Sequence, residues 1–283
     1  MIYYLLLIIA TILFAFQFFF NQQFQRLRGN TLEASLTFST YVHIVICIAM
    51  LCINGFRWRW SWFSAGMALI RAVMDVTFGY CSIQALACAN LSVYSTFSML
   101  GGMLLPFAYG VAFAGESFTL PKFLCCLLIS LALFLTVQPG KHSRKSVFYY
   151  FAVFTLNGLY GVVAALHQKM PELAVDSQSF SAISSLFTVI IAVGISMIKL
   201  KNFPVLKKPE IKFAGLFGIF CGTGNLLLLI ALKQVNASVQ YPIVTGGTMV
   251  MSTVICLLRK EKLTKRDVVA TVIAFAATIL IIL

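Results

Sequence analysis

The chain has 283 residues, of which 60% are hydrophobic and 10% are charged, and its mean hydropathy is +0.95. Soluble globular domains carry about 25% charged residues, so this composition excludes a soluble protein and indicates an integral membrane protein. The net charge of +13 comes mostly from Lys and Arg in short stretches between apolar runs. In such places they act as topology signals and as contacts to anionic lipid, so nucleic acid is not an expected partner.

Apolar runs of about 20 residues, the length that crosses a bilayer as a helix, recur along the whole chain. There are ten, at residues 2–24, 33–54, 62–86, 91–114, 119–138, 146–168, 178–198, 212–233, 237–258 and 265–283. The sequence thus predicts an all-α membrane protein with ten transmembrane helices and leaves no segment for a soluble catalytic domain. The first run lacks a basic flank and a cleavage site, so we expect a retained helix and not a signal peptide.

The two halves of the chain share an ordered series of short motifs. Asn90-Leu91-Ser92-Val93 returns 146 residues later as Asn236-Ala237-Ser238-Val239. Each copy is followed by a glycine pair, an acid, a threonine and a last apolar run: Gly101-Gly102, Glu116 and Thr119 in the first half, and Gly246-Gly247, Glu261 and Thr264 in the second. We therefore predict two five-helix repeats, 1–140 and 146–283, with a linker at 141–145. Because five is odd, the second repeat enters the membrane in the opposite sense, and this inverted repeat is typical of secondary transporters.

Local signals at the ends of the runs agree with this division. Glu33 and Asp176 open the second and seventh runs, where an acid suits a helix N-terminus. Thr264 and Asp267 have the spacing of a capping box at the start of the last run. Glu261 and its counterpart Glu116 are interpreted as polar hinges between spans. The glycine pairs fit either a hinge in a gate or close contact between helices.

The distribution of positive charge predicts the orientation. Fifteen of the 21 Lys and Arg residues lie in the loops after the odd-numbered runs, five lie in the loops after the even-numbered runs, and Arg71 lies inside a run. Positively charged loops stay in the cytoplasm. We therefore predict a multi-pass protein of the cytoplasmic membrane with both termini on the extracytoplasmic side.

The ten spans, the paired halves and their shared ending resemble the drug/metabolite transporter superfamily in its ten-helix EamA-like form. The residues that carry the resemblance are Glu261-Lys262-Leu263-Thr264 and the weaker copy Glu116-Ser117-Phe118-Thr119. Family members often carry a proline in the second half of the fourth and ninth spans; Pro106 fits this pattern, whereas Pro242 lies near the start of the ninth span. The resemblance implies a central cavity lined mainly by spans 1, 3, 4, 6, 8 and 9, and alternating access by rocking of helix bundles.

Arg71 and Asp75 are the main candidates for the site. They lie four residues apart in the third span, so they share one helix face. Ionisable residues at membrane depth mark functional sites by default, because burying them is costly. Arg71 would meet an anionic group of a zwitterionic substrate, and Asp75 would meet a cationic group or carry the coupling proton. The guanidinium keeps Asp75 ionised until substrate draws Arg71 away. The alternative is a self-neutralising pair that only fixes helix packing.

Polar and aromatic side chains recur on the other spans expected to face the cavity. They are Gln17 in the first span, Tyr94 and Ser98 in the fourth, Asn157 and Tyr160 in the sixth, Asn225 in the eighth, and Gln240 and Tyr241 in the ninth. Each one alone could bond a neighbouring helix, but their concentration on these spans favours a binding site. We expect Tyr94, Asn157, Asn225 and Gln240 to line the cavity. His43 is a single histidine in the second span, for which packing without titration is the preferred interpretation.

The sequence holds no motif of an enzyme. It has no Walker loop, no HExxH motif and no paired intramembrane aspartates, and its eight cysteines lack metal-ligand spacing. We expect no cofactor and no metal. The leading hypothesis is a secondary active transporter of a small polar or zwitterionic metabolite, amino acid or amine-like, with protons as a candidate coupling ion and a monomer or weak dimer as the assembly. The alternatives are a facilitated exporter or exchanger, and a non-transporting receptor or assembly subunit.

Overall fold

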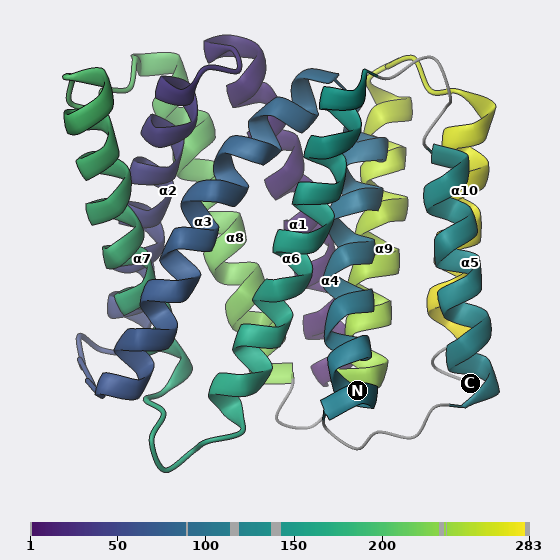
Figure 1. The fold of residues 1–283 in the computed structure, drawn as a ribbon, viewed down its shortest axis with the longest axis horizontal. Coiled ribbons are helices and arrows are strands. Elements are labelled where there is room, and N and C mark those ends of the chain that lie inside the picture. The colour runs from purple at the N-terminus through teal and green to yellow at the C-terminus, as the bar shows by residue number, and fades with distance from the viewer. Residues whose placement is uncertain are drawn as a thin grey trace.

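The computed structural model describes residues 2–88, 90–113, 119–136, 143–231, 235 and 237–280, and the regular secondary structure in these ranges is all helical (Figure 1). Seven helices (α1 to α4 and α6 to α8) are long and apolar enough to cross a membrane, and α9 includes a shorter apolar stretch, Ile243–Leu258. The predicted all-α membrane class is thereby confirmed, while the crossing of the bilayer by all ten helices stays a prediction. The elements are α1 (Ile2–Arg28), α2 (Leu32–Ile53), α3 (Trp62–Cys88), α4 (Leu91–Phe113), α5 (Leu120–Thr136), α6 (Arg144–Gln168), α7 (Ser177–Ile195) with a π-helical turn η1 (Ser196–Leu200), α8 (Lys208–Ala231), α9 (Ala237–Leu258) and α10 (Lys265–Leu280).

Side-chain caps set the starts of several helices. The oxygens of Thr31 and Asp176 accept hydrogen bonds from the backbone N–H three residues later, at 3.1 and 2.9 Å, and so begin α2 and α7. At the start of α10, the Thr264 N–H donates to Asp267 at 2.9 Å and the Asp267 N–H donates back to the Thr264 hydroxyl at 3.2 Å. This reciprocal pair confirms the predicted capping box.

Helix α6 begins earlier than the apolar pattern suggested. Ser143 caps it, and the helix starts at Arg144, so the last two residues of the expected linker 141–145 are helical. The first two residues of that linker lie outside the described ranges. The division into repeats at 1–140 and 146–283 stays a prediction.

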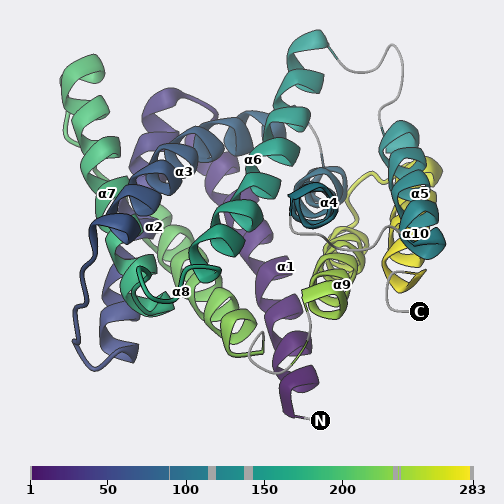
Figure 2. The ribbon, with the colours of Figure 1, turned by 60° about the horizontal axis from the view of Figure 1, so that its bottom comes forward.

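The helices pack in a pattern that mixes the two halves of the chain. Helix α1 packs on α8 and α9 of the second half, while α6 packs on α3 and α4 of the first half. Helix α2 lies beside α7 and α8, and α4 also contacts α9. Helices α5 and α10 pair with each other at one edge of the bundle (Figures 1 and 2). The centre is therefore enclosed by helices from both halves, and α5 and α10 lie outside it.

Glycines allow the α4–α6 pair to approach closely. A Cβ atom added at Gly101 would lie 1.9 Å from the backbone carbonyl oxygen of Phe154, and one added at Gly158 would lie 2.5 Å from the carbonyl oxygen of Gly101. The interface thus has backbone against backbone, as small residues permit in membrane bundles. Of the two interpretations of the first glycine pair, close helix contact is the one that this geometry supports.

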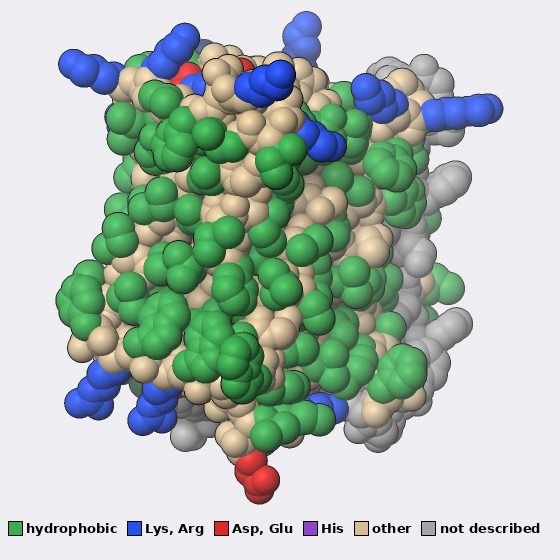
Figure 3. All heavy atoms as spheres, turned by 60° about the vertical axis from the view of Figure 1, so that its left-hand side comes forward, with side chains coloured by type: hydrophobic (Ala, Val, Ile, Leu, Met, Phe, Trp, Pro, Cys, Tyr) green, Lys and Arg blue, Asp and Glu red, His purple; other side chains and the backbone are tan. Residues whose placement is uncertain are grey.

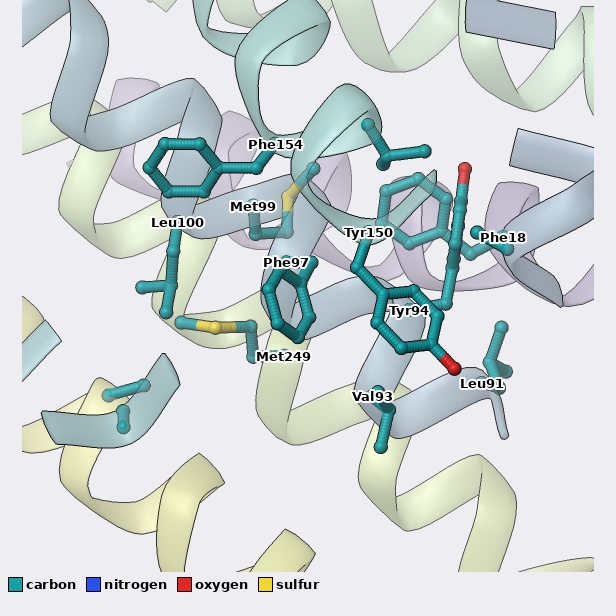
Figure 4. Packing of buried hydrophobic residues seen from close by; sticks show 14 of the residues in the cluster. Phe18, Leu91, Val93, Tyr94, Phe97, Met99, Leu100, Tyr150, Phe154 and Met249 are labelled. Atoms are coloured by element: carbon teal, nitrogen blue, oxygen red, sulfur yellow. The ribbon is translucent and has the colours of Figure 1, made fainter. Parts of the chain in front are cut away.

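A cluster of large side chains fills the space beside this contact. Phe18 of α1, Tyr94 and Phe97 of α4, Tyr150 of α6 and Met249 of α9 are buried and gathered in one layer (Figure 4). The rings of Phe18 and Tyr94 meet edge to face with centroids 5.2 Å apart. Because lipid is as apolar as these residues, close packing and not exclusion from water holds such a layer together.

The outer surface suits a lipid environment. On the face that Figure 3 shows, hydrophobic side chains cover the middle and Lys and Arg gather at both ends. Large apolar residues such as Leu5 on α1, Ile48 on α2 and Ile190 on α7 are exposed. Continuous apolar surface of this extent is rare on soluble monomers and is the normal state of a protein that contacts hydrocarbon.

Candidate functional site

A cavity of about 240 Å³ lies in the centre of the bundle. Residues of α1, α2, α3, α4, α6, α7, α8 and α9 line it. All six helices that the sequence predicted as cavity helices contribute, and α2 and α7 contribute in addition. The volume of the cavity suits a small metabolite, since pockets for drug-sized ligands are larger, at about 300–1,000 Å³.

Six of the predicted site residues line this cavity, and the others are placed differently. The lining residues are Gln17, Arg71, Asp75, Asn157, Tyr160 and Asn225. Ser98 and Gln240 are fully buried behind the wall: the carbonyl oxygen of Ser98 accepts a hydrogen bond from Asn157 at 2.7 Å, and Gln240 donates to the Leu228 carbonyl at 2.9 Å. The side chain of Tyr241 lies outside the described part of the structure.

Tyr94 also lies behind the cavity wall, which corrects its predicted position. Its hydroxyl is 2.6 Å from the hydroxyl of Ser82, and Ser82 in turn accepts a hydrogen bond from Asn21 at 2.7 Å. Ser82 and Asn21 both face the cavity. The Tyr94 ring packs on Phe18 and its hydroxyl is hydrogen-bonded to Ser82. Tyr94 therefore positions cavity residues and does not itself line the cavity.

Arg71 and Asp75 do not pair with each other, although they share one face of α3. Among the described side chains, no acidic group lies within 4 Å of the Arg71 guanidinium, and no hydrogen-bond acceptor is assigned to it. The guanidinium lies instead over the rings of Tyr160 and Phe180, 5.9 and 5.7 Å from their centroids. Ring faces attract a cation but leave its N–H donors free. This conformation therefore does not contain the self-neutralising Arg71–Asp75 pair that was the alternative interpretation.

Asp75 has its partners on other helices. Nε2 of His43, on α2, lies 3.5 Å from Oδ2 of Asp75, and the hydroxyl of Thr188, on α7, lies 3.3 Å from the same oxygen. Tyr160 is also close enough to interact with this carboxyl group. Both the His43 and the Asp75 side chains are 14% exposed, so the contact is shielded from solvent.

His43 is a cavity residue that the sequence analysis did not include among its site candidates. It lines the cavity and contacts the one ionisable acid there, instead of only packing in α2. Its Nδ1 is 2.8 Å from the backbone carbonyl of Ser39, one turn earlier. Position in the second span was no signal for this role, because the resemblance pointed to other helices for the cavity.

Two amide side chains on α1 add unpaired acceptors. Oε1 of Gln17 and Oδ1 of Asn21 are buried and have no hydrogen-bond donor, although both residues line the cavity. A buried polar atom without a partner costs about 1–3 kcal/mol. Such atoms fit a site where a bound molecule supplies the missing donors.

Ion pairs tie the C-terminal end of α1 to helices of both halves. Arg28 contacts Glu210 on α8 and, at 2.8 Å, Glu33 on α2. Arg26 contacts Glu261, beyond the end of α9, at 2.9 Å. Glu261 is therefore held in an ion pair between α1 and the α9–α10 connection, and is not only a polar hinge. The cavity-lining part of α1 ends at Asn21, before this layer.

In the ranges that the structure describes, no group of three or more His, Cys, Asp or Glu residues is arranged to hold a metal ion. The lining residues bring to the cavity the Arg71 guanidinium, the His43–Asp75 contact, amides and hydroxyls. These groups can bind a small polar molecule and hold a proton.

Comparison with known proteins agrees with this architecture. Residues 147–283 match the model of the EamA-like transporter family, whose members are transporters and not enzymes. No match is found among curated proteins, whereas 27 chains of solved structures match. One of these, titled only "Crystal structure of protein", has a TM-score of 0.63 and 14% identity over 96% of both chains, which shows a shared fold. The C-terminal half of the chain therefore resembles the EamA-like transporter family of the drug/metabolite transporter superfamily, and this resemblance indicates a membrane transporter of that type.

Proposed function

We propose that the protein is a secondary active transporter of a small polar or zwitterionic metabolite, such as an amino acid or amine. The observation that carries this proposal is the Arg71 guanidinium, which faces a central cavity without an acidic partner. An ionisable side chain at membrane depth is costly and marks a functional site by default, so this position favours a ligand that brings an anionic group.

The remaining lining residues support a ligand with donors as well. The unpaired oxygens of Gln17 and Asn21 can accept hydrogen bonds from an ammonium or hydroxyl group. Asn157 and Asn225 add further polar contacts to the cavity wall. A molecule with an anionic group at Arg71 and a hydrogen-bond donor at the Gln17 and Asn21 oxygens satisfies both the guanidinium and the unpaired acceptors. An amino acid is the simplest such molecule.

Alternating access is proposed on the basis of the helix packing. In the predicted repeat, each helix of the first half corresponds to the helix five places later. Under this correspondence the contacts of α1 with α8 and α9 are equivalent to contacts of α6 with α3 and α4, and the structure contains all four. The pairs α2–α7, α4–α9 and α5–α10 map onto themselves. This correspondence supports the predicted inverted repeat, in which one half rocks against the other around the cavity. The ion pairs at the end of α1 would then close one side.

The proposed location is the cytoplasmic membrane with both termini extracytoplasmic. Single cysteines at positions 2 and 143 in a background without other reactive thiols, treated with a membrane-impermeant maleimide in intact cells, test this. Labelling at position 2 alone is expected, because the loop at 143 belongs to the more positive set. Labelling at 143 alone would show the opposite orientation.

Two alternatives remain to be separated by experiment. A facilitated exporter or exchanger would bind the same class of molecule but would not accumulate it against a gradient. A non-transporting receptor or assembly subunit would catalyse no flux in proteoliposomes at all. The cavity with its unpaired guanidinium disfavours an assembly subunit, which needs no ligand site, and the flux measurement separates a transporter from a receptor.

Ligand binding can be tested with the purified protein and a panel of amino acids, amines, nucleosides and sugars. A compound that binds only the folded state raises the unfolding temperature. At a concentration of 100 times its Kd it adds about 2.7 kcal/mol to the free energy of unfolding. We expect stabilisation by compounds that carry a carboxylate, and its loss in Arg71→Ala. Stabilisation of Arg71→Ala and the parent protein by the same compounds to the same extent would contradict the assignment of Arg71.

A further inference from the structure

The contact between His43 and Asp75 has a geometry that calls for a proton. Nδ1 of His43 lies 2.8 Å from the carbonyl oxygen of Ser39. A carbonyl oxygen only accepts hydrogen bonds, so Nδ1 carries a hydrogen. The other ring nitrogen, Nε2, then faces Oδ2 of Asp75 at 3.5 Å. Without a proton on either atom, the lone pair of Nε2 would face a carboxylate oxygen, which is repulsive.

We propose that His43 and Asp75 hold one exchangeable proton between them and form the proton-binding site of this transporter. The proposal rests on the proposed function and names its coupling site. The proton lies either on Nε2, which gives an imidazolium beside a carboxylate, or on Asp75, which gives a neutral acid that donates to Nε2. Both forms have zero net charge and belong to one coupled titration. Removal of the proton leaves one negative charge in the cavity wall.

The surrounding groups are consistent with a single-proton pair. Arg71 on α3, Tyr160 on α6 and Cys221 on α8 are the ionisable groups that act on Asp75 or are acted on by it. Helix α7 contributes the neutral hydroxyl of Thr188, and the described residues of α1 and α7 that line the cavity carry no ionisable group. Among the described residues around the cavity, Arg71 is therefore the one permanent charge beside the pair.

This arrangement links the proton to Arg71. While the pair holds its proton, Asp75 is already neutralised, and Arg71 remains over the rings of Tyr160 and Phe180 with its donors free. When the proton leaves, Asp75 becomes an unpaired carboxylate one turn from Arg71 on the same helix face. The guanidinium is then drawn to Asp75 and withdrawn from an anionic ligand. Proton and anionic group therefore bind with positive coupling, which is what co-transport requires.

Histidine NMR can detect the shared proton without any ligand. The chain has three histidines, His43, His142 and His167, so ¹⁵N-histidine labelling of the full-length protein in micelles gives few signals, and His43→Gln assigns one set. We expect His43 to carry hydrogen on Nδ1. In Asp75→Asn, we expect a large change in the ¹⁵N signal of its Nε2, because that atom loses the group with which it shares the proton. Glu172→Gln, at an exposed carboxyl group away from the cavity, should leave this signal unchanged.

The result that overturns the proposal is the same Nε2 signal for His43 in the parent protein and in Asp75→Asn, or a parent His43 with a hydrogen on Nε2 and none on Nδ1. If Asp75→Asn does not fold, infrared spectroscopy of the protonated carboxyl band in the parent and in His43→Gln replaces it, and an unchanged titration of that band overturns the proposal. Failure of the proposed function is a separate result. Proteoliposomes that do not move any amino acid, with the NMR coupling present, would refute the transport activity and leave the proton site in place.

Discussion

Asp75→Asn is expected to abolish accumulation of the transported compound against its gradient while leaving exchange across the membrane. The amide has nearly the shape of the carboxyl group and keeps the contact with Thr188, so the fold should persist. It cannot take up or release a proton, however, so the pH gradient no longer drives uptake. One pH unit is worth about 1.36 kcal/mol, so coupling to one proton supports about tenfold accumulation in the parent, and the variant should reach a ratio of about one.

The measurement uses proteoliposomes and the compound that the stability panel selects, with an imposed pH gradient for accumulation and equal pH for exchange. Glu172→Gln is the matched control, because it removes a carboxylate from an exposed loop and not from the cavity. Uphill transport by Asp75→Asn at the level of the parent would assign a structural role to the carboxyl group and place coupling elsewhere.

Arg71→Ala should behave differently from Asp75→Asn. If Arg71 were the sole partner of Asp75, Arg71→Ala would leave the Asp75 carboxylate without compensation, at a cost of about 3–5 kcal/mol. In the structure Asp75 keeps His43 and Thr188 as partners, so Arg71→Ala should fold and lose binding of carboxylate compounds.

Gly101→Ala is expected to be strongly destabilising, although alanine is the best helix former. The added Cβ would lie 1.9 Å from the backbone carbonyl oxygen of Phe154, and a backbone atom cannot move aside as a side chain can. Helices α4 and α6 would have to separate, which changes the packing of the buried layer around Phe97 and Tyr150. Overpacking of a well-packed core costs about 1–3 kcal/mol and sometimes more.

The matched control is Gly66→Ala on α3. A Cβ at Gly66 would meet no atom within 4 Å, so helix propensity alone acts there and favours alanine by about 1 kcal/mol. Thermal unfolding of the purified variants in the same detergent compares the two. Equal unfolding temperatures for Gly101→Ala and Gly66→Ala would show that the α4–α6 contact is not as tight as the geometry indicates.

Features that depend on residues close together in the chain were predictable from the sequence. The start of α7 at Asp176, the acid Glu33 in the first turn of α2 and the Thr264–Asp267 box depend on residues within one turn of each other, so the sequence specifies them. The membrane class follows from composition and from the length of the apolar runs, because hydrocarbon thickness sets the length of a spanning helix. The resemblance to the transporter superfamily rested on the repeated order of such local motifs.

The partners of the site residues depend on helix packing, and here the sequence was a weaker guide. Arg71 and Asp75 share a face of α3, and this much follows from a spacing of four. That Asp75 meets His43 from α2, and that Arg71 turns to aromatic rings from α6 and α7, depends on how three other helices are placed around α3. The position predicted for Tyr94 was wrong for the same reason. Its hydroxyl is hydrogen-bonded to Ser82 across the α3–α4 contact, which the sequence does not specify.

The sequence by itself therefore determined the membrane class, the helical segments and the set of polar residues from which a site can be made. Only the tertiary structure decided which of these residues face the cavity and which charge is left without a partner. The physical reason is the range of the interactions: caps and spacing act within a turn of one helix. The protonation and pairing of Asp75 depend instead on atoms a few ångströms away on helices that are remote in the chain.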